Sequence, residues 1–449
     1  MKKANQTIHI VGGGLAGSEC ALQLANFGFK VVLFEMRQGN IMTPAHKTKD
    51  FAELVCSNSF GTLNPVSCPG ELKAEAELLG SYILKAAKLA AVPAGQALGV
   101  DRAVFAQEIS KQIENHPNIE VRKEVVEKLS DIPRPAVIAT GPLTNENLAR
   151  DLLEHLGQKF LYFFDAIAPI VDADTIDTTF AWKADRYGKG NNDYYNCPMN
   201  KEEYYAFINE IKLAKKIEPK EFEKDTPYFD GCMPIEEMIR RGDETLRFGP
   251  LKPVGLDDPR TGRYPYAVVQ LRQDNLEGTA FNMVGFQTKL AYGEQQRIFK
   301  MIPGLQNAEF LKLGSIHRNM YVNSPEVLNQ DLSSKKDPDL YLAGQITGVE
   351  GYFESTCIGM LVANFIEQKY SDKPFNPPPR ESAMGALLHA ITLEKKENFQ
   401  PTNINFGLLP ALPVPKGRKI PKDIKKKKQI ENAQVAFNAW LNKSLPTHL

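Results

Sequence analysis

The chain has 449 residues, of which 43% are hydrophobic, and its 54 basic side chains balance 54 acidic ones. This length allows two or three packed units, and this composition excludes an intrinsically disordered chain. The net charge of zero argues against a protein that is basic over its whole surface, although a local basic patch would be hidden in the sum.

The sequence predicts neither a leader peptide nor a membrane span. Two lysines precede the apolar residues 8–11, but three glycines then interrupt the stretch before it reaches the length of a signal-peptide core. Every long apolar stretch is broken by a charge or a proline before it could cross a bilayer. The cysteines are scattered without a CxxC pair, which disfavours a disulfide scaffold and a zinc site. We expect a cytoplasmic protein with reduced thiols and no bound metal.

The first predicted element is a strand over residues 8–11, which runs through a glycine-rich turn into a helix. In this turn Gly12 allows the tight bend, Gly14 lets a pyrophosphate approach the backbone, and Gly17 lets the helix pack on the strand. A second strand over residues 30–34 ends at Glu35, whose carboxylate can accept from both ribose hydroxyls. The alternative is a glycine-rich turn in an unrelated α/β domain. The pattern favours a dinucleotide site formed by Gly12, Gly13, Gly14, Leu15, Ala16, Gly17 and Glu35.

Two segments far downstream bear on whether the dinucleotide is FAD or NAD. Residues 136–142 form a buried strand closed by a glycine turn. Residues 340–345 repeat this pattern, and a glycine-rich stretch leads to Tyr352 and a helix over residues 355–368. A chain that leaves the nucleotide domain and returns with a strand, a glycine turn and a helix has the layout of a two-domain flavoprotein.

The segment over residues 185–319 is rich in tyrosine and charge, which predicts an inserted domain. Within it we expect a helix over residues 201–217 and strands over 268–271 and 280–286. A stiff proline-rich connector at residues 374–379 then leads into a helix near residues 382–391.

A basic run near the end of the chain extends from Lys416 to Lys428 and is opposed by Asp423 alone. Such a run usually forms a solvated, flexible face. The functional alternative is an arm that contacts phosphates, and an RNA substrate would favour it.

Two of the six cysteines lie where a thiol could do chemistry. Cys232 precedes Pro234, two glutamates and an apolar pair, a pattern that predicts a helix start, and a helix N-terminus with nearby arginines lowers the pKa of a thiol. Cys56 lies in a polar loop soon after the second strand. The remaining cysteines are expected to be buried and inert; they are Cys20, Cys68, Cys197 and Cys357.

Over nearly its whole length the chain resembles the folate- and FAD-dependent tRNA uracil-5-methyltransferases of the TrmFO type, relatives of the GidA flavoproteins. Several long and unusual strings carry the resemblance. They are residues 12–19 (GGGLAGSE), 53–59 (ELVCSNS), 230–236 (DGCMPIE), 301–305 (MIPGL), 317–319 (HRN), 348–355 (GVEGYFES), 385–388 (GALL) and 399–408 (FQPTNINFGL).

The resemblance implies a Rossmann-like, glutathione-reductase-like α/β fold that binds FAD and carries an inserted α+β domain. The expected division is residues 1–185 and 321–449 for the FAD-binding domain and 186–320 for the insertion. The implied reaction is methylation of carbon 5 of a T-loop uridine in tRNA, with 5,10-methylenetetrahydrofolate as carbon donor and NADH or NADPH as reductant. Carbon 5 of uracil becomes nucleophilic once a thiolate adds to carbon 6, and a methyl product requires a hydride that a reduced flavin can supply.

The resemblance also implies the site residues. Cys232 is expected as the nucleophilic thiolate and Cys56 as a second catalytic thiol, with the reverse assignment left open. Gly344, Gly351 and Tyr352 are expected at the cofactor, Tyr352 as the aromatic neighbour of the flavin or the folate. His317, Arg318 and Asn319 are expected at the substrate.

Other functions remain as alternatives to tRNA methylation. They are the same chemistry on ribosomal RNA, and a GidA-like flavoprotein that binds RNA without methyl transfer. A flavin disulfide reductase would require a cysteine pair close in sequence, and the chain has none.

Overall fold

Five parallel strands form the sheet at the centre of the first unit. The computed structural model describes residues 6–43, 45–158, 161–217, 228, 233–393, 399–413 and 420–444. The strand order is β16–β7–β1–β2–β6, and each neighbouring pair is parallel. The strands are β1 (Thr7–Val11), β2 (Lys30–Phe34), β6 (Ile119–Arg122), β7 (Ala136–Ile138) and β16 (Leu340–Leu342). This sheet confirms the predicted Rossmann-like α/β fold.

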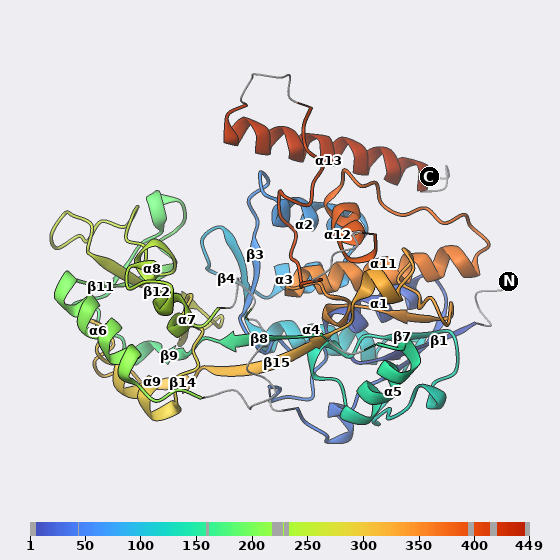
Figure 1. Cartoon of the computed structure of the whole chain (residues 1–449), viewed down its shortest axis with the longest axis horizontal. Helices are drawn as coiled ribbons and strands as arrows, with labels where there is room; N and C mark the ends of the chain where they lie inside the picture. The colour runs from blue at the N-terminus through green and yellow to red at the C-terminus, as the bar shows by residue number, and fades with distance from the viewer. Residues whose placement is uncertain are drawn as a thin grey trace.

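Two helices, α1 (Leu15–Asn26) and α11 (Tyr352–Tyr370), lie side by side against this sheet (Figure 1). Their close approach depends on Gly359, because a Cβ atom there would lie 2.2 Å from the carbonyl oxygen of Ala16. The returning helix predicted over residues 355–368 is therefore confirmed. It begins three residues earlier than expected, directly after Gly351.

A small antiparallel sheet and several helices cover the rest of the first unit. The sheet has the order β3–β5–β4 and presents the loop over residues 51–58 next to the central sheet. Its strands are β3 (Ser59–Thr62), β4 (Ala91–Val92) and β5 (Ala97–Val100). The helices are α2 (Cys68–Leu78), α3 (Tyr82–Leu89), α4 (Arg102–Glu114), α5 (Glu146–Leu156) and α10 (Ser324–Val327).

A two-stranded antiparallel ribbon connects the first unit to the second. It consists of β8 (Leu161–Ile167) and β15 (Ser315–Tyr321), paired from Leu161↔Tyr321 to Ile167↔Ser315. In Figure 1 the ribbon runs between the two units, so the chain enters and leaves the second unit along neighbouring strands.

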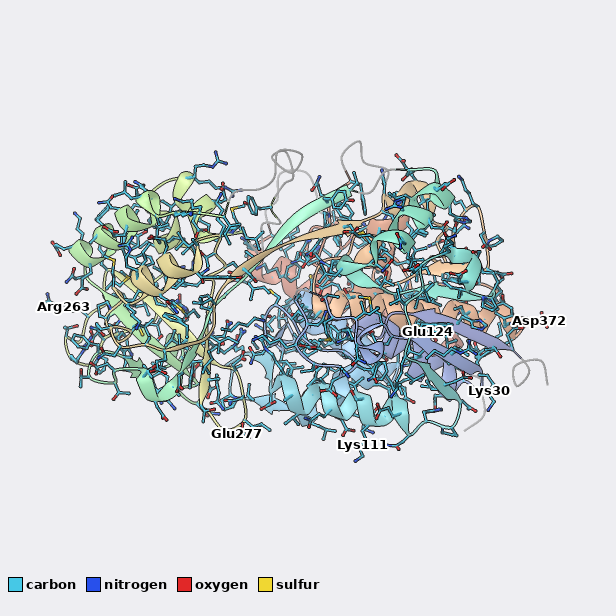
Figure 2. The ribbon with its side chains drawn as sticks, turned by 90° about the horizontal axis from the view of Figure 1, so that it is seen from below. Lys30, Lys111, Glu124, Arg263, Glu277 and Asp372 are labelled. Carbon is cyan, nitrogen blue, oxygen red and sulfur yellow. The ribbon has the colours of Figure 1, made fainter. Side chains whose placement is uncertain are left out.

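The second unit spans residues 168–312 and has its own hydrophobic core. Its sheet has the order β10–β11–β12–β13–β9–β14. These strands are β9 (Ile170–Asp172), β10 (Trp182–Lys183), β11 (Tyr194–Met199), β12 (Ala267–Gln273), β13 (Ala280–Met283) and β14 (Phe310–Lys312), and the helices are α6 (Lys201–Leu213), α7 (Ile235–Arg240), α8 (Thr245–Phe248) and α9 (Tyr292–Phe299). Figure 2 shows Arg263 and Glu277 at this end of the molecule and Lys30, Lys111 and Asp372 on the first unit.

Some boundaries in the second unit differ from the expected ones. Strands β9 and β10 precede residue 186, where we expected the insertion to begin, because the chain crosses between the units along β8. Strand β13 ends at Met283 instead of residue 286, since Gly285 has φ +75° and packs so closely on Pro250 that a Cβ would lie 2.4 Å from its ring. Helix α6 ends at Leu213, and Ala214 already has extended backbone angles.

The carboxyl-terminal part of the chain adds two helices, α12 (Ala383–Thr392) and α13 (Lys422–Ser444). The predicted helix near residues 382–391 is confirmed, with the Ser382 hydroxyl accepting from the Gly385 amide as its N-cap. Buried Ile430 and Phe437 hold α13 on the first unit, where it lies across α2 and α12 in Figure 1. In the described part of the chain, no helix has the length and apolar content needed to cross a bilayer.

Candidate functional site

A crevice lies at the carboxyl ends of the parallel strands β1, β2, β7 and β16. It has a volume of about 1060 Å³ including its open mouth, and is lined by Gly12, Gly14, Glu35, Gly344 and Tyr352 among others. Ligands of open α/β sheets bind at this edge, where the strand order changes direction. Leu15 and Ala16 also line the crevice, so the residues expected to bind a dinucleotide largely meet in one place.

The glycines of the first turn have separate steric roles. Gly12 has φ +102°, and a Cβ there would lie 2.6 Å from the Ala139 carbonyl oxygen. Gly17 brings α1 onto the turn, since its Cβ would lie 1.9 Å from the Gly12 carbonyl oxygen. A Cβ on Gly14, in contrast, would meet none of the described atoms within 4 Å, because it would point into open space. Gly14 is therefore the position at which a ligand can reach the backbone.

The N-termini of two helices lie at the crevice. Helix α1 begins after Gly14 and α11 after Gly351, and among the described residues neither N-terminus is capped by a side chain. Free amides and the helix dipole make such ends favourable for phosphate oxygens. Gly344 lies between the two helices and has φ +82°. A Cβ atom there would lie 2.7 Å from the Cβ of Ala16, which is too close for any residue but glycine.

Glu35 lies at the crevice as expected, but its carboxylate is already engaged. Oε2 accepts from the Gly13 amide at 2.7 Å, and Oε1 accepts from the backbone amide and the Nε of Arg37 at 2.9 and 3.0 Å. Burial alone would raise the pKa of Glu35, but the charge and hydrogen bonds of Arg37 hold the pKa below its ordinary value. A ribose would therefore share this carboxylate with Arg37.

Arg37 is a residue that the sequence analysis missed. Its side chain is buried between Glu35 and Glu53, and its NH1 donates to the Asp50 carbonyl at 2.9 Å and to Glu53 at 3.4 Å. Glu53 in turn accepts from the Lys47 and Thr48 amides at 2.9 and 3.0 Å. An arginine two residues after the strand-ending glutamate was the available signal. Through its ion pairs with Glu35 and Glu53, Arg37 connects the crevice to the segment that leads to Cys56.

Cys56 lies beside Tyr352, although 296 positions separate the two residues. The Tyr352 hydroxyl accepts from the Cys56 amide at 2.6 Å and from the Ser57 amide at 3.2 Å. The Cys56 thiol is half-buried and lies 3.8 Å from the carbonyl oxygen of Ala166, at the end of β8. Val55 and Tyr352 both line the crevice, so the backbone of the Cys56 loop lies beside it.

The second unit also contacts the Cys56 loop. Arg272 on β12 donates from Nε and NH2 to the Asn58 side-chain oxygen at 3.1 and 2.9 Å. The Asn58 side chain donates to the Gln273 carbonyl at 3.0 Å. Lys312, at the end of β14, donates to the Val55 carbonyl at 3.0 Å. The loop therefore lies at the junction of the two units.

For the remaining expected site residues, the structure gives at most a position in the fold. Cys232 lies outside the described residues; the helix predicted after it is present as α7, with Pro234 as its N-cap. His317, Arg318 and Asn319 lie on β15 of the connecting ribbon, and Asn319 is buried. Their contact with a substrate stays a prediction.

The other cysteines are buried, as expected. Burial raises the pKa of Cys68 and of Cys197 to about 12, and it also raises the pKa of Cys20 and of Cys357. These thiols stay protonated and unreactive at neutral pH.

Comparison with known proteins shows the family. The model of the family described as "Glucose inhibited division protein A" matches residues 7–374. A protein of Bdellovibrio bacteriovorus named "Methylenetetrahydrofolate--tRNA-(uracil-5-)-methyltransferase TrmFO" is 67% identical over 437 residues, covering 97% of this chain and 98% of the relative. A protein of the same name from Zymomonas mobilis is 52% identical over 440 residues, covering 97% of each chain.

Among solved structures, Aquifex aeolicus GidA has the same fold. It superposes with a TM-score of 0.67 at 16% identity, over 98% of this chain and 74% of that one. The long matches at high identity, together with this fold, show that the chain belongs to the glucose inhibited division protein A family and, within it, to the TrmFO group.

Proposed function

We propose that this protein transfers a one-carbon unit from 5,10-methylenetetrahydrofolate to carbon 5 of a uridine in tRNA and reduces it to a methyl group. The names of the relatives support the reaction and the substrate. The observation that carries the proposal in this chain is the hydrogen bond between the backbone amide of Cys56 and the hydroxyl of Tyr352, a residue that lines the dinucleotide crevice.

FAD fits the residues that line the crevice. The open space at Gly14 and the uncapped start of α1 suit its pyrophosphate, and the Glu35–Arg37 pair suits the adenosine ribose. Gly344, Gly351 and Tyr352 would lie along its other end, where α11 begins. When bound and reduced, a flavin supplies the hydride that a methyl product requires.

The thiols account for activation of the uracil. A thiolate that adds to carbon 6 makes carbon 5 an enolate carbon, which can attack the electrophilic one-carbon unit. We assign the addition to Cys232, and removal of the carbon 5 proton or protection of the site to Cys56. Tyr352 holds the Cys56 amide and turns its ring toward Phe60, with centroids 6.0 Å apart.

RNA binding is assigned to local basic surfaces, because the net charge of the chain is zero. The described part of the lysine run is helical and forms the first two turns of α13, where Lys422, Lys425, Lys427 and Lys428 are exposed. Arginines of the second unit, among them Arg240 and Arg263, add to this charge. We propose tRNA as the substrate, with His317, Arg318 and Asn319 of β15 contacting it.

NADH or NADPH would return the flavin to its reduced form, since the folate donor carries carbon at the formaldehyde level only.

A thiol mechanism and an RNA substrate both suit the reducing cytoplasm, which is the compartment we propose.

The decisive experiment supplies the purified protein with FAD, methylene-labelled methylenetetrahydrofolate and either NADH or NADPH. Unmodified tRNA and ribosomal RNA transcripts are offered separately, and labelled 5-methyluridine is located by nuclease digestion and mass spectrometry. We expect label in tRNA. Label confined to ribosomal RNA would change the substrate, and RNA binding without label in either RNA would support a GidA-like binding protein instead.

The thiols are tested in the same assay with Cys232→Ala, Cys56→Ala and the control Cys197→Ala, whose thiol is buried in the second core. RNA that carries 5-fluorouridine traps the adduct, because fluorine at carbon 5 cannot leave as a proton. Peptide mapping should find the adduct on Cys232. An adduct on Cys56 would reverse the assignment, and an adduct that persists in the double variant would reject thiol catalysis.

A further inference from the structure

One buried side chain joins the Cys56 loop to both units of the molecule. Asn58 is fully buried and lies where the loop enters β3. Its side-chain oxygen accepts from two guanidinium nitrogens of Arg272, at 3.1 and 2.9 Å. Its side-chain nitrogen donates to the carbonyls of Val100 in the first unit and Gln273 in the second, at 3.1 and 3.0 Å. An amide side chain has two donors and two acceptor sites, so these four bonds use the whole hydrogen-bonding capacity of Asn58.

Arg272 comes from a central strand of the second unit. It lies on β12, where its partners across the sheet are Tyr194 on β11 and Asn282 on β13. The residue is buried, with 9% of its surface exposed. A planar guanidinium on a strand that is paired on both sides presents its donors in a fixed geometry. Arg272 therefore holds the Asn58 oxygen from a rigid support.

The end of β12 is fixed against the first unit by neighbouring contacts. Asp274 pairs with Arg102, in the first turn of α4, at 3.1 Å. Asp101, the N-cap of the same helix, accepts from the Leu276 amide at 2.9 Å. These contacts lie on either side of the α4 start and set the distance between the two units here. The position of Arg272 relative to the Cys56 loop is therefore defined.

The backbone next to Asn58 reaches the crevice. The Cys56 and Ser57 amides both donate to the Tyr352 hydroxyl, at 2.6 and 3.2 Å, and Tyr352 lines the crevice. The segment over residues 53–58 forms neither a helix nor a strand, so long-range bonds hold it in place. A shift of Asn58 would therefore move the two amides away from the hydroxyl.

We propose that Arg272 is a positioning residue for the proposed reaction: through Asn58 it holds the Cys56 loop where the loop amides bind the Tyr352 hydroxyl at the crevice. Arg272 itself is not among the described residues that line the crevice, so it acts through the loop. The second unit thus helps to form the crevice wall. The proposal rests on the proposed function in taking Cys56 and Tyr352 as part of the working site.

The test uses the full chain with three variants and a control. Arg272→Met and Asn58→Leu each break the link with a side chain of similar size, and the double variant combines them. Arg186→Met is the matched control, because Arg186 also donates from Nε to a side-chain amide oxygen of β12, that of Gln270 at 2.9 Å. Its bond to the Val254 carbonyl at 2.9 Å likewise stays within the second unit.

The first readout is hydrogen exchange of the loop amides by mass spectrometry, which needs neither cofactor nor RNA. We expect Arg272→Met and Asn58→Leu to accelerate exchange at Cys56 and Ser57 about tenfold, because the bonds to the tyrosine hydroxyl open more often. Arg186→Met should stay within about twofold of the native rate. Native exchange in folded Arg272→Met overturns the proposal, and so does equal acceleration in the control.

A second substitution at the same position covers the case in which Arg272→Met does not fold. Arg272→Lys keeps the positive charge but cannot present two donors in the planar geometry of a guanidinium. We expect it to accelerate exchange at the loop amides about threefold. In that case, native exchange in folded Arg272→Lys overturns the proposal.

The second readout is folate-dependent methyl transfer to tRNA, expressed per bound flavin. In Arg272→Met and in Asn58→Leu, kcat should fall about tenfold while the KM for tRNA stays within about twofold, because only the placement of the reacting groups changes. The double variant should be no slower than the slower single variant, since both substitutions break the same link. A loss of about a hundredfold in the double variant, or a raised KM with native kcat, overturns the proposal. If the native protein transfers no methyl group, the proposed function fails, while the exchange result still decides whether Arg272 positions the loop.

Discussion

Replacing Arg37 by methionine tests the buried ion pair at the edge of the crevice. Glu35 is 4% exposed and Arg37 is 2% exposed, so the substitution leaves a carboxylate inside the protein without its cation. The amides of Gly13 and residue 37 still donate to it, but the bonds from Nε and NH2 at 3.0 and 3.3 Å are lost. Methionine has a comparable length, so the loss comes from charge and hydrogen bonding more than from packing.

Removal of one partner from a buried pair costs about 3–5 kcal/mol, because the remaining charge is uncompensated. With about 2.1 cal/mol/K of unfolding entropy per residue, that cost lowers the melting temperature by about 3–8 °C, depending on whether one unit or the whole chain unfolds. The assay is thermal unfolding followed by circular dichroism at pH 7, in the absence of added cofactor.

The double variant Arg37→Met, Glu35→Gln tests whether the uncompensated carboxylate causes the loss of stability. Glu35→Gln removes that charge, so the double variant should regain at least half of the stability lost in Arg37→Met. The pKa of Glu35 is lower in the folded protein than in the unfolded chain, where it is about 4. The Glu35–Arg37 pair therefore stabilises the folded protein fully above the unfolded pKa, and this stabilisation is lost as the pH falls through the folded pKa. In Arg37→Met the lowering effect of Arg37 is lost and burial raises the pKa of Glu35, so the deficit should begin to shrink above about pH 4 and continue to shrink as the pH falls through the lowered folded pKa of the native protein. A double variant no more stable than the single one would refute this account.

Further predictions concern the cofactor, the Cys56 loop, a buried carboxyl and the basic helix. Gly14→Val should abolish FAD retention without unfolding the chain, since its side chain would fill open space in the crevice; a yellow variant protein with native FAD content would contradict this. Tyr352→Phe removes the acceptor for two backbone amides, so hydrogen exchange at Cys56 and Ser57 should accelerate about tenfold, as measured by mass spectrometry. Burial raises the pKa of Glu75 to about 8, so this group destabilises the fold as the pH rises from about 4.5 through 8; Glu75→Gln should flatten the dependence of melting temperature on pH over that range. Replacing Lys425, Lys427 and Lys428 by glutamine should weaken tRNA binding and reduce its dependence on salt, whereas Lys443→Gln at the other end of α13 should not.

The nucleotide half of the fold was predictable because its signals are local. Strand β1, the glycine turn and β2 lie within thirty residues of each other, and the steric demands on Gly12 and Gly17 are properties of that turn alone. The returning strand β16 and helix α11 repeat the same short pattern.

The arrangement around Cys56 could not be predicted in this way. The bonds from Cys56 to Tyr352 and from Val55 to Lys312 join residues 296 and 257 positions apart, and neither leaves a periodic signal in the sequence. Arg37 was missed because a single charged residue after a strand resembles an ordinary surface position, whereas its burial depends on two carboxylates from different segments. For the lysine run the sequence left open a solvated, flexible face or an arm that contacts phosphates. The part of the run in α13 is helical and its lysines are mostly exposed, and the helix was not predicted because the apolar residues that pack it on the first unit, Ile430 and Phe437, come later in the chain.

The connecting ribbon makes the second unit a removable module. Ile167 and Ser315 are direct partners at its far end, so their Cα atoms lie about 5 Å apart, a gap that a two-residue β-turn can close. A chain in which such a turn replaces residues 168–314 would join β8 and β15 into a simple hairpin and leave the five-stranded sheet intact. Its first unit would lose the contacts that Asn58 and Arg102 make with β12 and the segment after it, while the crevice at Gly14 would be unchanged.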